Sequence, residues 1–464
     1  MRSRGAGMIV VLLIALAACG GPGASPSAPS PSPDGSASPA PATPTASPGG
    51  SADAVAAVRA DLEKLVTSME QRHPDLFRDM PEAVWREAVD RLDALIPELV
   101  PDQPERLMVE FMRLAALPGV AGGRNGHMTI EPLDRRPVLC IVTYTFADGV
   151  YVTRALPPNE DLVGARITAV EGRPIDEVQG LIEPLIASDN EHTPEIWFID
   201  AFRQPEVLVG SGILDAVGPV ELTVELPDGT ERTAEIGLVP PERILELPMQ
   251  DLDPWSGWAE DDLREIQLLH YLPERPEAVW TSRMGEWFWW TMLHDGATLY
   301  VRQNLVEPPT TTQLAGLLEA ARAPGVERMV FDLRHNLGGA STDGTLGAFQ
   351  AAMASIDRPG RFFIVTSTNV FSATPPLVSG LDRTTDAILV GEPTGGSPLA
   401  FGGGWSVELD ALPIPIKVNI PQLLGGASDD ERLTIEPDLP VPLTGADYFA
   451  GRDAAMEAIL AHQP

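Results

Sequence analysis

One stretch of the chain decides the fold: "RFFIVTSTNVFSATPPLVSGLDRTTDAILVGE", residues 361–392. Its two ends, 361–367 and 386–392, are short apolar runs rich in Val, Ile and Phe, as buried strands are. Between them, Pro375 and Pro376 suit the first turn of a helix, where a missing amide loses no hydrogen-bond partner. The stretch therefore predicts a strand, a helix and a second strand, with Ser372 where the first strand gives way to the helix.

The same alternation extends back to residue 297. "TLYVRQNL" (298–305) and "VERMVFDLR" (326–334) are predicted strands, and "TTQLAGLLEAARA" (311–323) and "DGTLGAFQAAMASI" (343–356) are predicted helices. Strands and helices in turn predict an α/β fold with a mostly parallel sheet covered by crossover helices. In such sheets the functional site lies where strands end. Ser372 lies at one strand end, and the turns at 338–339 and 391–396 lie at others.

The chain before residue 297 contains segments with different patterns of secondary structure. Residues 53–117 show helical periodicity, and residues 138–240 hold short strands interrupted by a helical insertion near 176–215. The segment 241–296 has no clear pattern. Its aromatic run "GEWFWW" (285–290) predicts a packed interface, with a substrate-facing wall as the alternative.

The first 52 residues are not expected to join the fold. Two arginines, an apolar run and small residues before Cys19 are typical of a secretory signal peptide. "LAAC" (16–19) resembles the bacterial lipobox, which implies cleavage before Cys19 and lipidation of its thiol. The alternative is an ordinary signal peptide. Residues 20–52 are Pro, Ala, Ser and Gly with one acid, which predicts a disordered tether. The expected location is outside the cell, at the outer face of the membrane.

Composition excludes several classes of function. The formal net charge is −34, which argues against nucleic acid and anionic lipid surfaces as partners. No His or Cys cluster has the spacing of a metal site, so neither a metal nor a cofactor is expected. The second cysteine, Cys140, lies in an apolar run and is expected to be buried and inert.

Taken singly, the candidate site residues have ordinary explanations. Ser372 could be a helix N-cap or a nucleophile. Gly338 and Gly339, in "DLRHNLGG" (332–339), could form a simple bend or present free amides to an oxyanion. His127, in "GGRNGHMTI" (122–130), could be a solvated loop residue or a general base.

Together and in this order, the segments resemble the C-terminal-processing (tail-specific) serine peptidases and the tricorn protease core. The match runs from about residue 53 to the C-terminus. It is carried by "GHMTI" (126–130), "FDLRHNLGG" (331–339), "VFSATPP" (370–376), "ILVGEPTGGS" (388–397) and "EPDLPV" (436–441). "GARITAVEGRPIDEV" (164–178) is similar to part of a PDZ domain. The resemblance implies a ClpP/crotonase-like core, with an N-terminal helical subdomain and a degenerate PDZ-like subdomain.

The resemblance also implies roles for residues. Ser372 is the nucleophile, and the amide of Ala373, with one from Gly338 or Gly339, forms the oxyanion hole. Tail-specific enzymes place a lysine base where this chain has Ser397.

The lysines of this chain do not replace that base. Only Lys64, on a predicted helix, and Lys417, in a predicted strand, are present. The tricorn-like branch instead uses histidine with an orienting glutamate, which match His127 and Glu431. Asp429 and Asp430 are alternatives to Glu431. Asn125 and Met128 depart from the "DGHT" pattern of the family.

We therefore predict six segments: a signal peptide (1–18), a lipidated cysteine and linker (19–52), a helical subdomain with the histidine segment (53–137), a PDZ-like subdomain (138–240), a connecting segment (241–296) and a peptidase core (297–464). The predicted function is an extracytoplasmic, lipid-anchored serine peptidase that hydrolyses peptide or protein substrates. A catalytically inactive protein of the same fold, binding a peptide or a small apolar ligand, is the alternative. A scaffold that binds partner C-termini through the PDZ-like region is a third possibility.

Overall fold

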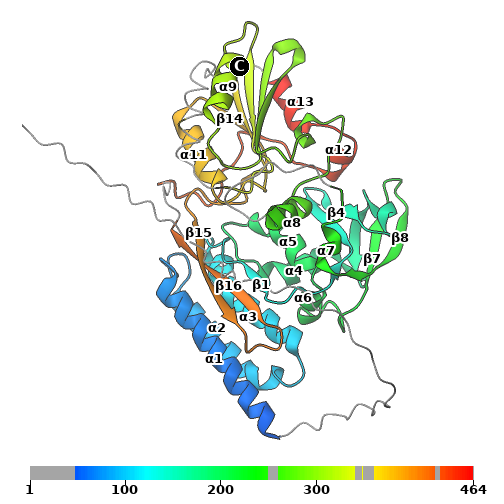
Figure 1. The fold of residues 1–464 in the computed structure, drawn as a ribbon, viewed down its shortest axis with the longest axis vertical. Coiled ribbons are helices and arrows are strands. Elements are labelled where there is room, and N and C mark those ends of the chain that lie inside the picture. The colour runs from blue at the N-terminus through cyan, green and yellow to red at the C-terminus, as the bar shows by residue number, and fades with distance from the viewer. Residues whose placement is uncertain (1–47, 249–259, 340–346, 348–359, 424–428, 463–464) are drawn as a thin grey trace, which may run out of the picture. The chain divides into compact units, whose positions relative to one another are not determined.

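The strand–helix–strand stretch forms the centre of a six-stranded sheet in the computed structural model (Figure 1). The structure describes residues 48–248, 260–339, 347, 360–423 and 429–462. The predicted signal peptide, Cys19 and the tether therefore lie outside the described residues, apart from the start of the first helix. The predicted helix at 343–356 lies outside them too, apart from residue 347.

The central sheet is parallel except at one edge. Its strand order is β10-β11-β12-β13-β14-β17, and only β10 runs antiparallel to its neighbour. The strands are β10 (Phe288–Leu293), β11 (Thr298–Gln303), β12 (Arg328–Asp332), β13 (Phe362–Thr366), β14 (Ile388–Gly391) and β17 (Leu439–Pro440). The predicted mixed α/β fold is confirmed, and so are the four strands predicted between residues 298 and 392.

Helices cover both faces of this sheet, because successive strand residues point to opposite sides. Phe362 and Ile364 of β13 pack with α9 (Thr311–Ala321) and α11 (Thr374–Thr384). Phe363 and Val365 pack with α12 (Gly445–Phe449) and α13 (Ala454–Ala461). Figure 1 shows α11 and α13 on opposite sides of the sheet. The middle strands β13 and β14 are largely buried on both faces and almost wholly apolar, which is why they were recognisable in the sequence.

The last three residues of the aromatic run at 285–290 begin the edge strand β10, which sequence reasoning missed. Phe288 packs into the core under α9 and α11, whereas Trp289 packs into the core on the other face. Both are almost fully buried. The run is thus a packed interface on each side of β10.

Three helices and a small antiparallel sheet form the N-terminal layer. The helices are α1 (Pro48–Arg72), α2 (Glu82–Leu99) and α3 (Pro104–Gly122). The sheet has the order β1-β16-β15, with β1 (Ile130–Pro132), β15 (Phe401–Leu409) and β16 (Ile416–Leu423). Thus a hairpin from late in the chain lies against the first helix (Figure 1).

The segment 138–240 is rich in antiparallel strands. Its main sheet has the order β3-β4-β5-β7-β8, with β6 beside β5, and β2 pairs with β9. The strands are β2 (Val138–Leu139), β3 (Ile141–Phe146), β4 (Gly149–Ala155), β5 (Arg166–Val170), β6 (Arg173–Pro174), β7 (Val220–Glu225), β8 (Glu231–Ile236) and β9 (Leu238–Val239). The predicted helical insertion is α4 (Ile175–Ile182), α5 (Thr193–Phe202) and α6 (Pro205–Gly210), and α7 (Pro241–Ile244) and α8 (Glu260–His270) follow β9.

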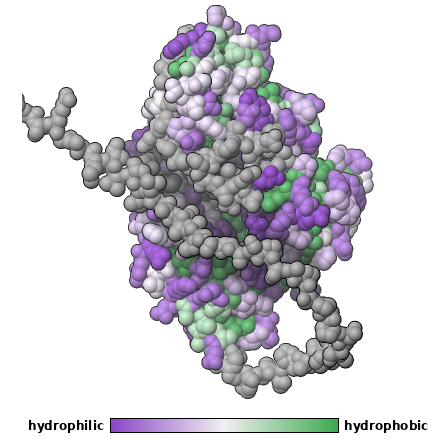
Figure 2. All heavy atoms as spheres, in the orientation of Figure 1, coloured by the Kyte–Doolittle hydropathy of each residue, from purple (hydrophilic) through white to green (hydrophobic). Residues whose placement is uncertain are grey.

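The described residues between 48 and 462 belong to one compact unit, so the predicted boundaries within it stay predictions. Short 3₁₀ helices occur at Glu160–Leu162, Glu183–Leu185, Val279–Thr281 and His294–Gly296. None of the described helices has the length and apolarity needed to cross a membrane. Hydrophilic residues cover much of the face seen in Figure 2, with hydrophobic ones in small groups among them.

Candidate active site

Ser372 occupies a strained turn between β13 and α11. Its φ is +57°, a left-handed conformation that residues with a Cβ rarely adopt. The N-cap of α11 is Ala373, and Ser372 does not cap the helix. The N-cap explanation of this serine is therefore wrong. Such strain persists only where the surrounding structure imposes it, and it is typical of functional sites.

The structure brings His127 to Ser372 across 245 residues of sequence. Nε2 of His127 lies 2.8 Å from Oγ of Ser372. The histidine belongs to the loop that follows α3, and its ring stacks on Phe371 with a centroid distance of 4.7 Å. The position of the ring is thus set by the end of α3, by Phe371 and by Ser372.

Burial makes this histidine neutral at pH 7. It lowers the pKa of His127 to about 4, because the charged ring loses its hydration, and the backbone of Phe401 only partly offsets this effect. A neutral ring can accept the serine proton at Nε2 if its own proton is on Nδ1. Nδ1 is buried and makes no hydrogen bond of good geometry with the described residues, although the backbone of Phe401 interacts with the ring and favours its charged form.

The structure does not bring the predicted orienting carboxylates to His127. Glu431 pairs with Arg78 at 3.2 Å, and its side chain is 73% exposed. Asp430 accepts a hydrogen bond from Ser379 at 2.7 Å and pairs with Arg432. Asp429 pairs with an arginine of α11. The three carboxylates at 429–431 therefore interact with arginines or with the Ser379 hydroxyl.

The glycine turn after β12 lies directly against the serine. A Cβ added to Gly338 would stand 2.4 Å from Cβ of Ser372 and 2.9 Å from its Oγ. The Gly338 amide donates to Oδ1 of Asn336 at 3.0 Å. Among the described residues, the amides of Gly339 and Ala373 donate to no protein group. These two predicted donors remain available to an oxyanion, at the end of β12 and the start of α11.

Asn336 shapes this turn, a role that sequence reasoning did not assign. Its side chain accepts from Thr374 Oγ1 at 2.8 Å and donates to the carbonyl of Gln303 at 3.1 Å. Its carbonyl accepts from the amide of Phe371 at 3.2 Å. Asn336 thus ties β11, the glycine turn and the serine turn together. Its place in "DLRHNLGG" was the only signal for this role.

A buried ion network fixes the end of β12. Asp332 is fully buried and pairs with Arg302 at 2.8 Å and Arg334 at 2.7 Å. Tyr300 donates a further hydrogen bond to it at 2.7 Å. The two guanidinium groups hold the pKa of Asp332 well below its usual range despite burial. The adjacent His335 is also buried, and this lowers its pKa to about 3.

Neither lysine is near Ser372. Lys64 donates to the carbonyl of Glu408 at 2.5 Å, and Lys417 pairs with Glu131 at 3.0 Å. Ser397, at the position of the lysine base, is fully buried, and its hydroxyl donates to the carbonyl of Leu433 at 2.6 Å. In the described residues, no group of three or more His, Cys, Asp or Glu side chains could hold a metal ion.

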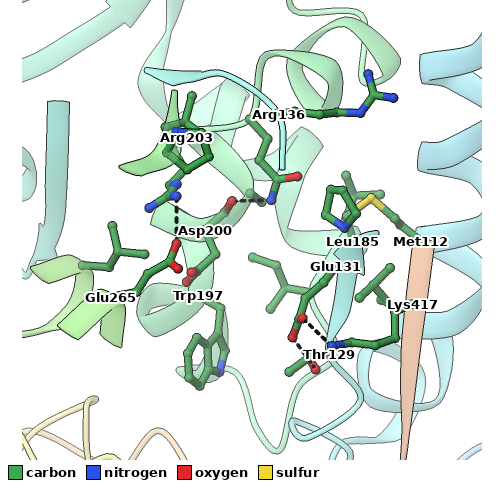
Figure 3. A pocket seen from close by; sticks show the side chains of 18 of the residues that line it. Met112, Thr129, Glu131, Arg136, Leu185, Trp197, Asp200, Arg203, Glu265 and Lys417 are labelled. Carbon is green, nitrogen blue, oxygen red and sulfur yellow. Dashed lines mark hydrogen bonds and ion pairs between the residues drawn. The ribbon is translucent and has the colours of Figure 1, made fainter. Parts of the chain in front are cut away.

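A cleft of about 660 Å³ borders the histidine loop. Gly126 and Met128, on either side of His127, contribute to its wall. Trp197 also lines it and packs edge-on against Phe371. Figure 3 shows Trp197 in this wall, and Lys417 and Arg203 each with a carboxylate partner. The lining also includes apolar side chains such as Met112 and Leu185, which are largely buried.

Comparison with solved structures identifies the fold. The crystal structure of a CPAF mutant matches with a TM-score of 0.57 at 11% identity, over 88% of this chain and 96% of that one. Mature CPAF complexed with lactacystin matches with a TM-score of 0.55 at 12% identity, over 88% and 97% of the two chains. The chain has the fold of CPAF. The tricorn protease covers 87% of this chain at 13% identity, but with a TM-score of only 0.36.

The likeness to CPAF shows the fold alone. It extends over nearly the whole length of both chains. No protein-family model matches the chain, and no curated protein matches its sequence. At this identity the likeness concerns the fold, so the chemistry of the site must be argued from its own residues.

Proposed function

We propose that the chain is a serine peptidase that hydrolyses peptide bonds through an acyl-enzyme at Ser372. The observation that carries this proposal is the 2.8 Å contact between Nε2 of His127 and Oγ of Ser372. It joins a strained serine at a helix start to a neutral, partly buried histidine, which is the arrangement of a nucleophile and its general base.

The reaction follows from this geometry. His127 takes the proton of Ser372 as Oγ bonds to the carbonyl carbon of the substrate. The amides of Gly339 and Ala373 stabilise the resulting oxyanion. The protonated histidine then gives its proton to the leaving amine as the C–N bond breaks. Water attacks the acyl-enzyme in the second half, with His127 again as base, and Ser372 is regenerated.

Labelling with a fluorophosphonate tests the proposal, because the probe phosphonylates only an activated serine. We expect wild type to be labelled and Ser372→Ala not to be labelled. His127→Ala should react about 1,000-fold or more slowly. Ser406→Ala, at an exposed serine of β15, is the matched control and should react like wild type.

Equal labelling of wild type and Ser372→Ala would overturn the proposal. A folded wild type that is not labelled at all would favour the alternative, a binding protein for a peptide or small apolar ligand. The cleft, and the pairing of Glu431 with Arg78 in place of His127, are the features that would suit that alternative.

The proposed location is the outer face of the membrane, with a lipid on Cys19. Only the N-terminal sequence supports this part of the proposal. In cells grown with a labelled fatty acid, we expect the label on the full chain and its loss in Cys19→Ala. A chain released into the medium without label would indicate an ordinary signal peptide instead.

A further inference from the structure

Asp189 is a fully buried carboxylate that joins two loops of the candidate site. It lies just before α5, in the helical insertion of the β-rich region. Its Oδ1 accepts a hydrogen bond from the amide of Gly126 at 2.7 Å, and its Oδ2 accepts one from the amide of Ser397 at 3.3 Å. Gly126 directly precedes His127. We call this arrangement, Asp189 with the amides of Gly126 and Ser397, the Asp189 clamp.

Backbone groups of residues 188–189 also hold the histidine loop. The amide of Arg124 donates to the carbonyl of Asp189 at 2.9 Å, and that of Asn125 donates to the carbonyl of Ser188 at 3.0 Å. Arg124 has a φ of +61°, so its backbone is strained as well. Three successive residues before His127 thus donate to residues 188–189. Of the three acceptors, only the one for Gly126 is a side chain.

The other end of the clamp reaches the serine turn. Ser397 follows Gly396, whose amide donates to the carbonyl of Val370 at 2.9 Å. Gly396 packs closely on the serine turn, because an added Cβ would stand 3.1 Å from Cα of Phe371. A closed path therefore runs from Ser372 through this loop to Asp189, on to His127, and back to Ser372.

We infer that Asp189, in its ionised form, positions His127 against Ser372 by holding the histidine loop and the loop around Ser397 together. The inference rests on the proposed function. It assigns Asp189 as a positioning residue, because Asp189 acts through Gly126 and not on the reacting atoms. It also implies that the site loosens when this carboxylate takes up a proton.

Protonation would break one half of the clamp. A carboxylate accepts at both oxygens, whereas a carboxylic acid has one oxygen that donates. The added proton would occupy Oδ2, which makes the longer contact, and would then face the N–H of Ser397. The hydroxyl oxygen of an acid is a poor acceptor, so the 3.3 Å contact with the Ser397 amide would be lost, whereas Ser397 Oγ would still donate to the carbonyl of Asp189 at 3.2 Å.

The surroundings place this change close to neutral pH. Burial raises the pKa of Asp189 to about 7, although the two amides and Arg124 oppose the shift. Arg124 is the charged group that faces Asp189 from the histidine loop, and it is already paired with Asp79 at 2.7 Å. From its own segment, Thr193 contributes a neutral hydroxyl, and from the other loop Ser397 contributes an amide.

The rate of fluorophosphonate labelling as a function of pH tests the inference. For wild type we expect the rate to fall on acidification near pH 7, where Asp189 takes up its proton. If His127 alone governed the rate, the fall would come near pH 4. Asp189→Asn should react about 10- to 100-fold more slowly at pH 8, with its fall moved toward pH 4. Asp176→Asn, at an exposed carboxylate of α4, should behave like wild type.

A second measurement does not require activity. Since the folded state raises the pKa of Asp189, it binds this proton more tightly than the unfolded chain does. The contribution of Asp189 to stability is therefore largest below about pH 4 and is lost as the pH rises through 7. The Tm of Asp189→Asn relative to wild type should increase over this range.

The outcomes separate this inference from the proposed function. Absence of labelling in wild type contradicts the proposed function, and with it a positioning role in catalysis. The Tm series still decides whether Asp189 is protonated near pH 7. Labelling of wild type with a fall near pH 4, or an unchanged profile in Asp189→Asn, overturns the inference alone.

Discussion

Gly338→Ala is expected to abolish reaction at Ser372 without unfolding the chain. Gly338 has a φ of +119°, and an added Cβ would stand 2.4 Å from Cβ of Ser372. Neither turn can move freely, because Asn336 ties both to β11. The added methyl group would displace the serine and the neighbouring oxyanion donors together. We expect at least about a 1,000-fold loss in the rate of fluorophosphonate labelling.

Gly325→Ala is a matched control for this substitution. Gly325 has a similar positive φ of +92°, but no heavy atom lies within 4 Å of an added Cβ. Both substitutions therefore force alanine into a positive-φ conformation, but only Gly338→Ala brings the new Cβ against Ser372. Gly325→Ala should lose stability but keep the wild-type labelling rate. Wild-type labelling by folded Gly338→Ala would show that the glycine turn does not constrain the serine.

Asp332→Asn is expected to cause the largest loss of stability. It would leave Arg302, which is fully buried, and the buried Arg334 without their shared carboxylate. Removing one partner of a buried ion pair leaves an uncompensated charge, which costs about 3–5 kcal/mol. We expect a decrease of this size in the free energy of unfolding, measured by denaturant titration.

Asp93→Asn provides the comparison. Asp93 pairs with Arg59 at 2.8 Å, the same distance as in the Asp332–Arg302 pair, but both side chains are nearly half exposed. Exposed pairs contribute about 0–1 kcal/mol, so this variant should be close to wild type. Similar losses in both variants would mean that burial of Asp332 does not set the strength of its network.

The sequence predicted those parts of the molecule that have a local signature. The strands of the central sheet are buried on both faces, so they appear as continuous apolar runs such as 362–366 and 388–391. Helix α11 begins at two prolines that fit only a first turn. The edge strand β10 was missed because four aromatic residues in a row show no clear alternation, although Phe288 and Trp289 face opposite cores.

The site could be anticipated only through the order of its motifs. Nothing in the local pattern around His127 or Ser372 reveals that they meet, since 245 residues separate them. Glu431 was expected to orient His127, but it pairs with Arg78. Sequence spacing does not reveal an ion pair between residues so far apart in the chain. Asp189 went unnoticed for the same reason. Its partners are backbone amides from distant loops, which any sequence could supply.

The scarcity of lysine has a practical consequence. The whole chain carries two lysines, and one of them, Lys417, lines the cleft beside the histidine loop. A Lys64→Arg chain would hold its one lysine ammonium at that cleft. An amine-reactive fluorophore attached there would act as an optical reporter of cleft occupancy. Since Lys417 takes no part in the proposed chemistry, such a reporter could detect a bound peptide or apolar compound even in Ser372→Ala.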